Sequence, residues 1–254
     1  NSLYENKDIY KIIELLKNKN LIYEKDNAVW FSGTSLGREK DRVLIKSTGE
    51  PTYRLPDMAY HITKYKRGYD LIIDIFGADH MDAYPDVIAV LKQLGYDTKK
   101  IKVLIHQFVS ILNDGSPVKM STRKANFITL NELVKEAGID AVRYFFIMRN
   151  INSHLNFDLD LAKEKSENNP VYYIQYAHAR ICTILSKKPL SLKDVNLDLL
   201  NTKDDLKIIF RLLDYKNIIL KLKDSLEPQL LSNYLYDLAS QFHKYYAHNR
   251  IISE

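Results

Sequence analysis

Cationic and hydroxyl side chains crowd into one short stretch of the chain, Pro117–Phe127, which reads PVKMSTRKANF. Lys119, Ser121, Arg123 and Lys124 all fall within it. Such side chains, together with backbone N–H groups, can hold a phosphate as negative charge builds on it. The same composition is typical of a solvated charged turn. Composition leaves both interpretations open, so the position of the stretch in the fold has to decide.

A second group of polar side chains, Asp79-His80-Met81-Asp82, follows an apolar run. Two acids and one histidine could be metal ligands, but no fourth partner is evident in the sequence. A metal site is therefore not predicted here.

A strand–helix–strand unit is predicted around these residues. Leu71–Phe76 and Ile101–Val109 are short runs rich in branched residues, as is Val43–Lys46, and each is typical of a strand. A helical pattern lies between the first two, which predicts a parallel strand pair. Ligands bind beyond the carboxyl ends of parallel strands. We therefore expect Gly77–His80 and the loop Asp114–Lys124 at the same sheet edge.

The glycines divide the chain into two parts. All eight lie at or before Gly138. Because glycine marks the turns of α/β segments, we expect a parallel-sheet α/β domain followed by an all-α helical bundle. The boundary is predicted near Asn168–Pro170, which gives domains of residues 1–167 and 168–254.

Three amphipathic helices are predicted in the second part, over residues 171–186, 204–222 and 228–249. Tyrosines alternate with lysine and arginine along them, a pattern that suits stacking on unpaired RNA bases. Helix-to-helix packing is the other interpretation of the same side chains. Both stay open for Tyr173, Tyr176 and Arg180.

Length and charge set broad limits. The chain has 254 residues, 46% of them hydrophobic and 27% charged, which is typical of globular protein. A net charge of +5 permits an anionic partner. Cys182 is the single cysteine, so we expect a reducing compartment, the cytoplasm. No apolar run approaches the ~20 residues that span a bilayer, and no membrane association is expected.

Five blocks of the sequence together form a recognisable series: Lys40–Ser47, Thr52–His61, Gly77–His80, Val118–Arg123 and Pro170–Arg180. The most specific is the last, Pro-Val-Tyr-Tyr-Ile-Gln-Tyr-Ala-His-Ala-Arg, whereas Lys-Met-Ser alone is a weak signal. In this order the blocks resemble those of bacterial arginyl-tRNA synthetases, a class I family.

The resemblance implies an arginine–tRNA ligase. A Rossmann-type catalytic domain would join L-arginine to ATP and pass it to tRNA(Arg), and a helical domain would read the anticodon. Mg²⁺ is expected with ATP, although no residue can be assigned as its ligand. The protein is expected to be a cytoplasmic monomer.

The resemblance also assigns the arginine site. Tyr53 and Asp57 match residues that receive the guanidinium, and a carboxylate suits this because it meets two guanidinium donors at once. Asp57 can alternatively be a helix N-terminal charge worth ~0.3–1 kcal/mol. His80 is expected to contact arginine or ATP.

The ATP site would combine the two stretches already described. Asp79, His80, Met120 and Lys119 are expected to bind ATP. Lys119, Ser121 and Arg123 are the expected catalytic residues, which would stabilise the departing pyrophosphate. Tyr173, Tyr176 and Arg180 are the candidates for contact with tRNA.

Two features depart from the family pattern. The His-Ile-Gly-His element is absent, and the Lys-Met-Ser-Lys-Ser loop takes the form Lys119-Met-Ser-Thr-Arg123. Either Arg123 or Lys124 could replace the second lysine. The chain also starts without methionine. We therefore expect the C-terminal part of a catalytic domain and a truncated helical domain, inactive alone.

Overall fold

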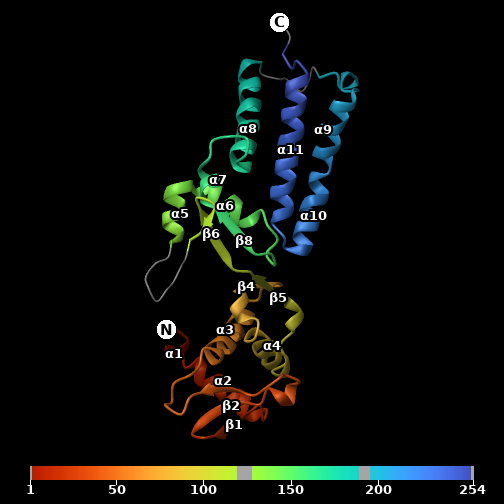
Figure 1. Ribbon diagram of the computed structural model, residues 1–254. Helices are drawn as coiled ribbons and strands as arrows, with labels where there is room; N and C mark the ends of the chain where they lie inside the picture. The colour runs from red at the N-terminus through yellow and green to blue at the C-terminus, as the bar shows by residue number, and fades with distance from the viewer. Residues whose placement is uncertain (1, 119–127, 189–194, 253–254) are drawn as a thin grey trace. The chain divides into compact units, whose positions relative to one another are not determined.

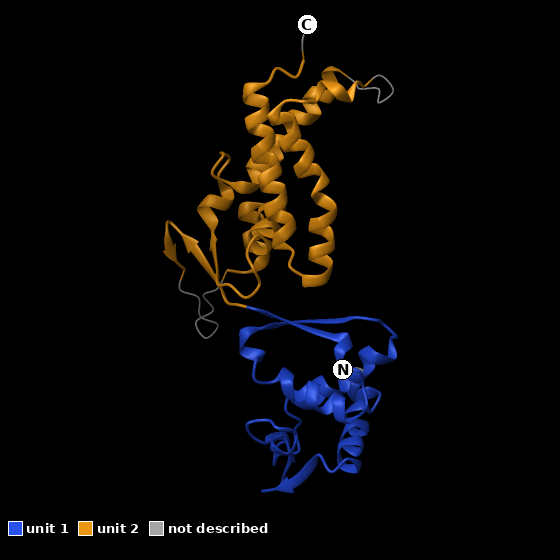
Figure 2. Ribbon diagram, turned by 90° about the vertical axis from the view of Figure 1, so that its right-hand side faces the viewer, with its two compact units in different colours: residues 1–106 blue, residues 107–254 orange. Residues whose placement is uncertain are grey.

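The structure is a computed structural model that describes residues 2–118, 128–188 and 195–252. The chain divides into two compact units, residues 1–106 and 107–254 (Figure 2).

Unit 1 contains two small sheets. The antiparallel sheet consists of β1 (Ile22–Lys25), β2 (Ala28–Phe31) and β3 (Arg42–Ile45). In the other sheet, β4 (Ile72–Gly77) and β5 (Ile101–His106) are parallel, with Gly77 opposite His106. The predicted parallel pair is confirmed. The predicted strand at 43–46 is also present as β3, but it pairs with the antiparallel strand β2, and neither β2 nor β1 was predicted.

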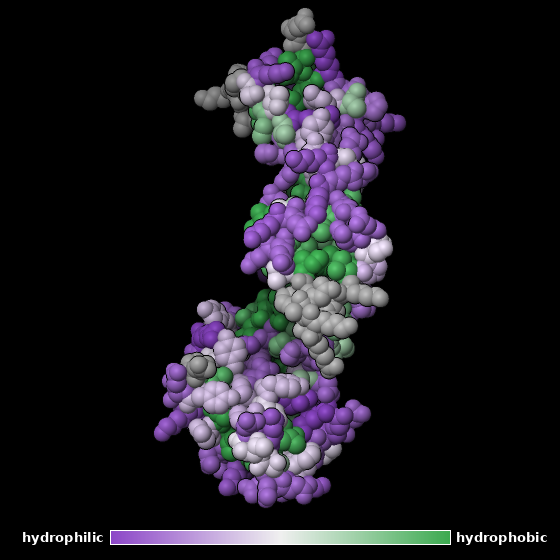
Figure 3. Space-filling view, turned by 60° about the vertical axis from the view of Figure 1, so that its left-hand side comes forward, coloured by the Kyte–Doolittle hydropathy of each residue, from purple (hydrophilic) through white to green (hydrophobic). Residues whose placement is uncertain are grey.

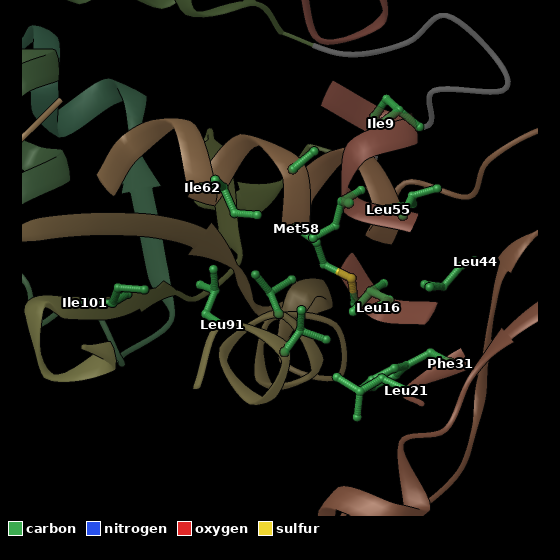
Figure 4. Packing of buried hydrophobic residues seen from close by; sticks show 14 of the residues in the cluster. Ile9, Leu16, Leu21, Phe31, Leu44, Leu55, Met58, Ile62, Leu91 and Ile101 are labelled. Carbon is green, nitrogen blue, oxygen red and sulfur yellow. The ribbon is translucent and has the colours of Figure 1, made fainter. Parts of the chain in front are cut away.

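The helices of unit 1 pack around one apolar core. They are α1 (Ser2–Glu5), α2 (Asp8–Asn18), α3 (Arg54–Lys66) and α4 (Tyr84–Gln93). Figure 4 shows Leu16, Phe31, Met58 and Leu91 converging from α2, β2, α3 and α4. Because the core includes Leu55, Met58 and Ile62, one face of α3 is fixed against it.

The first part of unit 2 contains the remaining strands. Its sheet has the order β7-β6-β8, in which β6 and β8 are parallel and β6 and β7 antiparallel. The elements are β6 (Val109–Asn113), β7 (Ser116–Pro117), α5 (Leu130–Ala137), α6 (Ile139–Ile147), β8 (Leu155–Asp158) and α7 (Leu159–Lys163). Phe145 of α6 and Phe157 of β8 are fully buried in its core.

The rest of unit 2 is helical. Figure 1 shows α11 (Gln229–His248) between α8 (Pro170–Lys187) on one side and α9 (Lys203–Leu213) with α10 (Tyr215–Ser225) on the other. The single helix predicted over 204–222 is wrong, because α9 ends at Leu213 and α10 begins at Tyr215. Asp214 is both the C-terminal cap of α9 and the N-terminal cap of α10, so it separates the two helices.

The fold class predicted from the sequence is confirmed: parallel-sheet α/β elements are followed by a helical region. The face in Figure 3 is mostly hydrophilic, with smaller hydrophobic areas in both units. None of the helices in the described residues is long and apolar enough to cross a membrane.

Candidate functional site

The first turn of α3 presents Tyr53 and Asp57 together. The segment before it is tied to β3, since the Thr52 hydroxyl donates to the Val43 carbonyl at 2.8 Å and the Thr52 N–H to the Leu44 carbonyl at 2.8 Å. Apolar residues of α3 face the core, which turns the other side of the helix outward. Tyr53 is accordingly 61% exposed, and the Asp57 side chain keeps 29% of its surface accessible.

Aromatic rings join this turn to the end of β4. His80, in a short 3₁₀ helix after the strand, stacks on Phe76 with ring centroids 5.5 Å apart. Its other neighbour is Tyr53, edge-on at 6.4 Å. The structure therefore brings two of the predicted arginine-binding residues side by side. Asp79 lies next to them and is exposed, with its carboxylate 3.8 Å from His80 Nε2.

An arginine–aspartate cluster holds the start of α3 against the start of α4. Arg54 donates to Asp86 at 3.2 Å and to Asp82 at 3.3 Å, and Arg42 of β3 donates to Asp82 at 2.6 Å. Asp86 is almost fully buried. The Arg54 guanidinium also lies over the Tyr53 ring, 5.1 Å from its centroid. This cluster positions Tyr53, and its role was not predicted from the sequence.

A buried chain of charged groups leads from Asp57 into unit 1. His61, 2% exposed, points Nδ1 at the Asp57 backbone carbonyl (2.8 Å) and at Asp57 Oδ1 (3.4 Å). Its Nε2 lies 2.8 Å from Asp74 Oδ2, and Lys64 donates to the other oxygen of Asp74. Asp74 comes from β4, so this chain joins helix to strand.

The protonation of this chain follows from its contacts. Burial alone lowers the pKa of His61, but the Asp57 and Asp74 carboxylates outweigh burial and raise the pKa from 6.5 to about 9. Burial alone raises the pKa of Asp74, but hydrogen bonds from His61 and Lys64 outweigh it, and the pKa lies below its ordinary value. At neutral pH His61 is therefore an imidazolium between two carboxylates.

Sequence reasoning missed His61, Lys64 and Asp74. The signals were present: His61 lies four residues after Asp57 and therefore on the same helix face. Asp74 is the one charged residue inside the apolar run Leu71–Phe76. A buried charge in a strand calls for a partner.

The loop stretch falls largely outside the described residues. This applies to the predicted Lys119, Met120, Ser121 and Arg123, and to Lys124. The preceding residues form a tight hairpin, in which Asp114 and Gly115 both have positive φ and Asn113 pairs with Ser116. Asp-Gly at such a turn is favoured because glycine accepts this backbone conformation without strain.

The prediction that both stretches follow strands of one sheet is wrong. The run 101–109 is divided, because β5 ends at His106 in unit 1 and β6 begins at Val109 in unit 2. Gly77–His80 follows β4 of one sheet, and the loop follows β6 and β7 of another. Two closely spaced strands look like one long apolar run when only local pattern is available.

The candidates for contact with tRNA, Tyr173, Tyr176 and Arg180, belong to α8 and contact His243 of α11. The Arg180 guanidinium lies over the Tyr176 ring at 4.1 Å and donates to the Tyr176 hydroxyl at 2.9 Å and to His243 Nδ1 at 3.0 Å. Since Nδ1 accepts this bond, Nε2 carries the proton that His243 donates to the Tyr173 carbonyl at 3.0 Å. These contacts support helix packing, and contact with tRNA stays a prediction.

Among the residues that the structure describes, no group of three or more His, Cys, Asp and Glu side chains is arranged to hold a metal ion.

Two family models match the chain. Residues 1–176 match the model of tRNA synthetases class I (R), catalytic domain, and residues 174–254 match the DALR anticodon binding domain. The chain therefore belongs to the class I tRNA synthetase catalytic-domain family, with a DALR domain following.

Two curated relatives of the chain are arginine–tRNA ligases. The chain is 49% identical to the arginine–tRNA ligase of Desulfotalea psychrophila and 46% identical to that of Salinibacter ruber, over its whole length in both cases. It covers 47% and 46% of those proteins, so it spans about half the length of the curated relatives it matches.

Solved structures share the fold. A structure from Campylobacter jejuni has a TM-score of 0.88 at 36% identity and covers all of this chain and 56% of that one. Thermus thermophilus arginyl-tRNA synthetase has a TM-score of 0.80 at 19% identity, with 96% of this chain and 51% of that chain covered.

Proposed function

We propose that the full-length protein containing this sequence is an arginine–tRNA ligase. The observation that carries the proposal is the partly exposed Asp57 carboxylate, which lies one helical turn after Tyr53 and is backed by His61. The ring of Tyr53 in turn contacts that of His80. A carboxylate with one side held and the other open can accept two parallel N–H bonds from a planar guanidinium. The ammonium of lysine cannot make that pair of bonds, which gives selectivity for arginine. The relatives named arginine–tRNA ligase support the same substrate.

Activation of arginine then needs positioning and charge stabilisation. The arginine carboxylate attacks the α-phosphate of ATP, a P–O bond to the β-phosphate breaks, and pyrophosphate leaves. In our proposal Lys119, Ser121 and Arg123 stabilise the negative charge that accumulates on the leaving group. Asp79, His80 and Met120 contact ATP.

The second step transfers arginine to tRNA. A ribose hydroxyl at the 3′ end of tRNA(Arg) attacks the arginyl carbonyl, and the bond from that carbonyl carbon to the adenylate phosphate oxygen breaks. AMP leaves, and the hydroxyl proton passes to its phosphate. We assign residues 1–167 to the catalytic domain and 168–254 to the anticodon domain. The DALR match at 174–254 supports a tRNA partner. A monomer in the cytoplasm, with Mg²⁺ bound to ATP, completes the proposal.

The test is Asp57→Asn in the full-length protein, with arginine-dependent ATP–pyrophosphate exchange in the presence of tRNA(Arg) as the readout. Loss of a charged fork in a partly exposed site should raise the arginine KM by about 10- to 100-fold. The ATP KM should stay unchanged, because the change is confined to the guanidinium contact.

The matched control is Asp70→Asn, an exposed carboxylate in the turn after α3. It should leave both KM values unaltered. An equal rise in the KM values for arginine and ATP would make Asp57 a structural residue, and absence of arginine-dependent exchange in the unaltered protein would refute the ligase.

A further inference from the structure

The imidazole of His61 lies directly behind the proposed guanidinium receptor. It is buried beneath α3, with Nδ1 toward Asp57 and Nε2 2.8 Å from Asp74 Oδ2. Both ring nitrogens therefore face oxygen acceptors. Only the imidazolium can donate from both nitrogens at once, so these contacts favour the charged form.

We propose that His61 is a positioning residue for arginine recognition, which orients the Asp57 carboxylate and is itself held by Asp74 and Lys64. This inference rests on the proposed function. It adds residues that never touch the substrate but determine how well Asp57 receives it.

The effect on Asp57 follows from its two oxygens. Oδ1 lies 3.4 Å from His61 Nδ1 on the buried side, while 29% of the side chain remains accessible on the other. A carboxylate whose plane is held in this way does not have to be ordered when arginine arrives. Without the imidazolium, Asp57 could rotate about its terminal bond, and binding would have to order it.

Asp74 and Lys64 make the arrangement rigid and electrically balanced. The Lys64 ammonium donates to Asp74 and lies 3.3 Å from His61 Nε2. Asp57 and Lys64 from α3 and Asp74 from β4 are the charged groups that contact His61 in the described part of the chain. Two carboxylates and two cations cancel, so no uncompensated charge is buried before arginine binds.

A purely structural role is the competing explanation, since the same contacts join α3 to β4. The two roles differ in how their effects combine. A positioning residue acts through Asp57, so its removal should matter little once Asp57 has lost its charge. A structural residue should weaken the protein equally in both backgrounds, and should alter ATP binding as well.

The experiment is a double-mutant cycle of His61→Gln and Asp57→Asn in the full-length protein, read out by arginine-dependent ATP–pyrophosphate exchange. His61→Gln alone should raise the arginine KM about 10-fold with kcat and the ATP KM within about 2-fold of the parent, because the ground-state contact is lost. In the Asp57→Asn background the same change should have less than about a 2-fold effect.

His154→Gln, at an exposed position of unit 2, is the matched control and should be silent. If His61→Gln does not fold, Asp74→Asn replaces it, because the amide oxygen still accepts from Nε2 while the charge that supports the imidazolium is gone. It should raise the arginine KM in the same selective way.

The outcomes separate the two proposals. If Asp57→Asn raises the arginine KM but His61→Gln and Asp74→Asn do not, His61 has no positioning role and the proposed function stands. Additive effects of His61→Gln and Asp57→Asn would likewise overturn positioning in favour of structure. If none of the three changes affects arginine selectively, the arginine site itself is misassigned.

Discussion

At the scale of single residues, the candidate site depends on the buried charge of His61, and burying a charge costs free energy. His61 is buried, and it remains protonated because the Asp74 carboxylate accepts from Nε2 and the Asp57 carboxylate lies 3.4 Å from Nδ1. Removing either carboxylate would leave one positive charge of the four-group cluster without compensation, which the low-dielectric interior disfavours. The affinity of Asp57 for a cation and the stability of unit 1 are therefore linked through one side chain.

The first prediction concerns the pH dependence of stability. The pKa of His61 is about 9 in the folded protein against 6.5 for the free side chain, so folding favours the protonated form. Its stabilisation is complete below the lower value and is lost as pH rises through the higher one. The free energy of unfolding should fall across that window by on the order of 1–3 kcal/mol. Urea unfolding at pH values on both sides of the window measures it.

The variant His61→Gln supplies the comparison for this measurement. It removes the titrating group, so its stability should be lower near neutral pH and should change less across the same window. Parallel profiles of unfolding free energy against pH for the parent and the variant would show that folding does not raise the pKa of His61.

A second prediction at this scale concerns the loop. Lys119→Ala should lower the single-turnover rate of arginyl-adenylate formation by about 10²–10³-fold, by analogy with the loss of one charge-stabilising donor. Arginine binding should be unchanged, since Lys119 is proposed to act on the leaving pyrophosphate. Lys135→Ala on α5 is the control, being an exposed lysine on a neighbouring element. An unaltered rate in a folded variant would remove Lys119 from the mechanism.

At the scale of elements, helices α8 and α11 are joined by polar groups as well as by apolar packing. Arg180 makes two hydrogen bonds and lies over the rings of Tyr176 and Tyr246, at 4.1 and 4.9 Å. Such an arrangement uses the planar fork and flat face of guanidinium, which an ammonium lacks.

The prediction here is that Arg180→Lys destabilises the helical part. Loss of the fork and the stacked face should reduce the free energy of unfolding by roughly 1–2 kcal/mol. Affinity for tRNA(Arg) should be retained in the folded fraction, because the charge is kept. Arg143→Lys, at an exposed position on α6, is the comparison. Unchanged stability with weakened tRNA binding would instead place Arg180 at the RNA surface.

Local pattern predicted elements well where pattern and contact coincide. The β4–α4–β5 unit was predicted because apolar runs and helix-terminal residues all lie within its own stretch of chain. The strands β1 and β2 were missed because each has a single β-branched residue among its four, whereas β3, which is equally short, has Val43 and Ile45. The break at Asp214 was missed because the helical spacing of apolar residues continues across it.

Some residues of the candidate site could be predicted from the sequence and others could not. Tyr53, Asp57 and His80 could be proposed from the family resemblance, and the structure places Tyr53 and His80 together. The partnership of His61 with Asp74 could not, because it joins residues of a helix and a strand through a fold that pattern alone does not specify. Charge pairs across elements depend on distances of a few ångströms, which composition and spacing leave undetermined.

At the scale of the whole molecule, the residues proposed to bind arginine and those proposed to contact tRNA belong to different compact units. The candidate arginine-binding residues all belong to unit 1, whereas the loop and the candidate tRNA contacts belong to unit 2. Each unit has its own apolar cluster. A substitution that weakens one core therefore need not weaken the other, so the two parts can be studied for stability one at a time.

The central place of α11 has a consequence for how the protein is made. Synthesis runs from the N-terminus, so α8, α9 and α10 leave the ribosome before the helix on which they pack (Figure 1). Until α11 emerges, Tyr173 and Arg180 lack their partner His243, and apolar faces of the earlier helices stay open to water. The helical part can therefore complete its folding only after α11 has been synthesised, and until then its open apolar faces are exposed to chaperones and to aggregation.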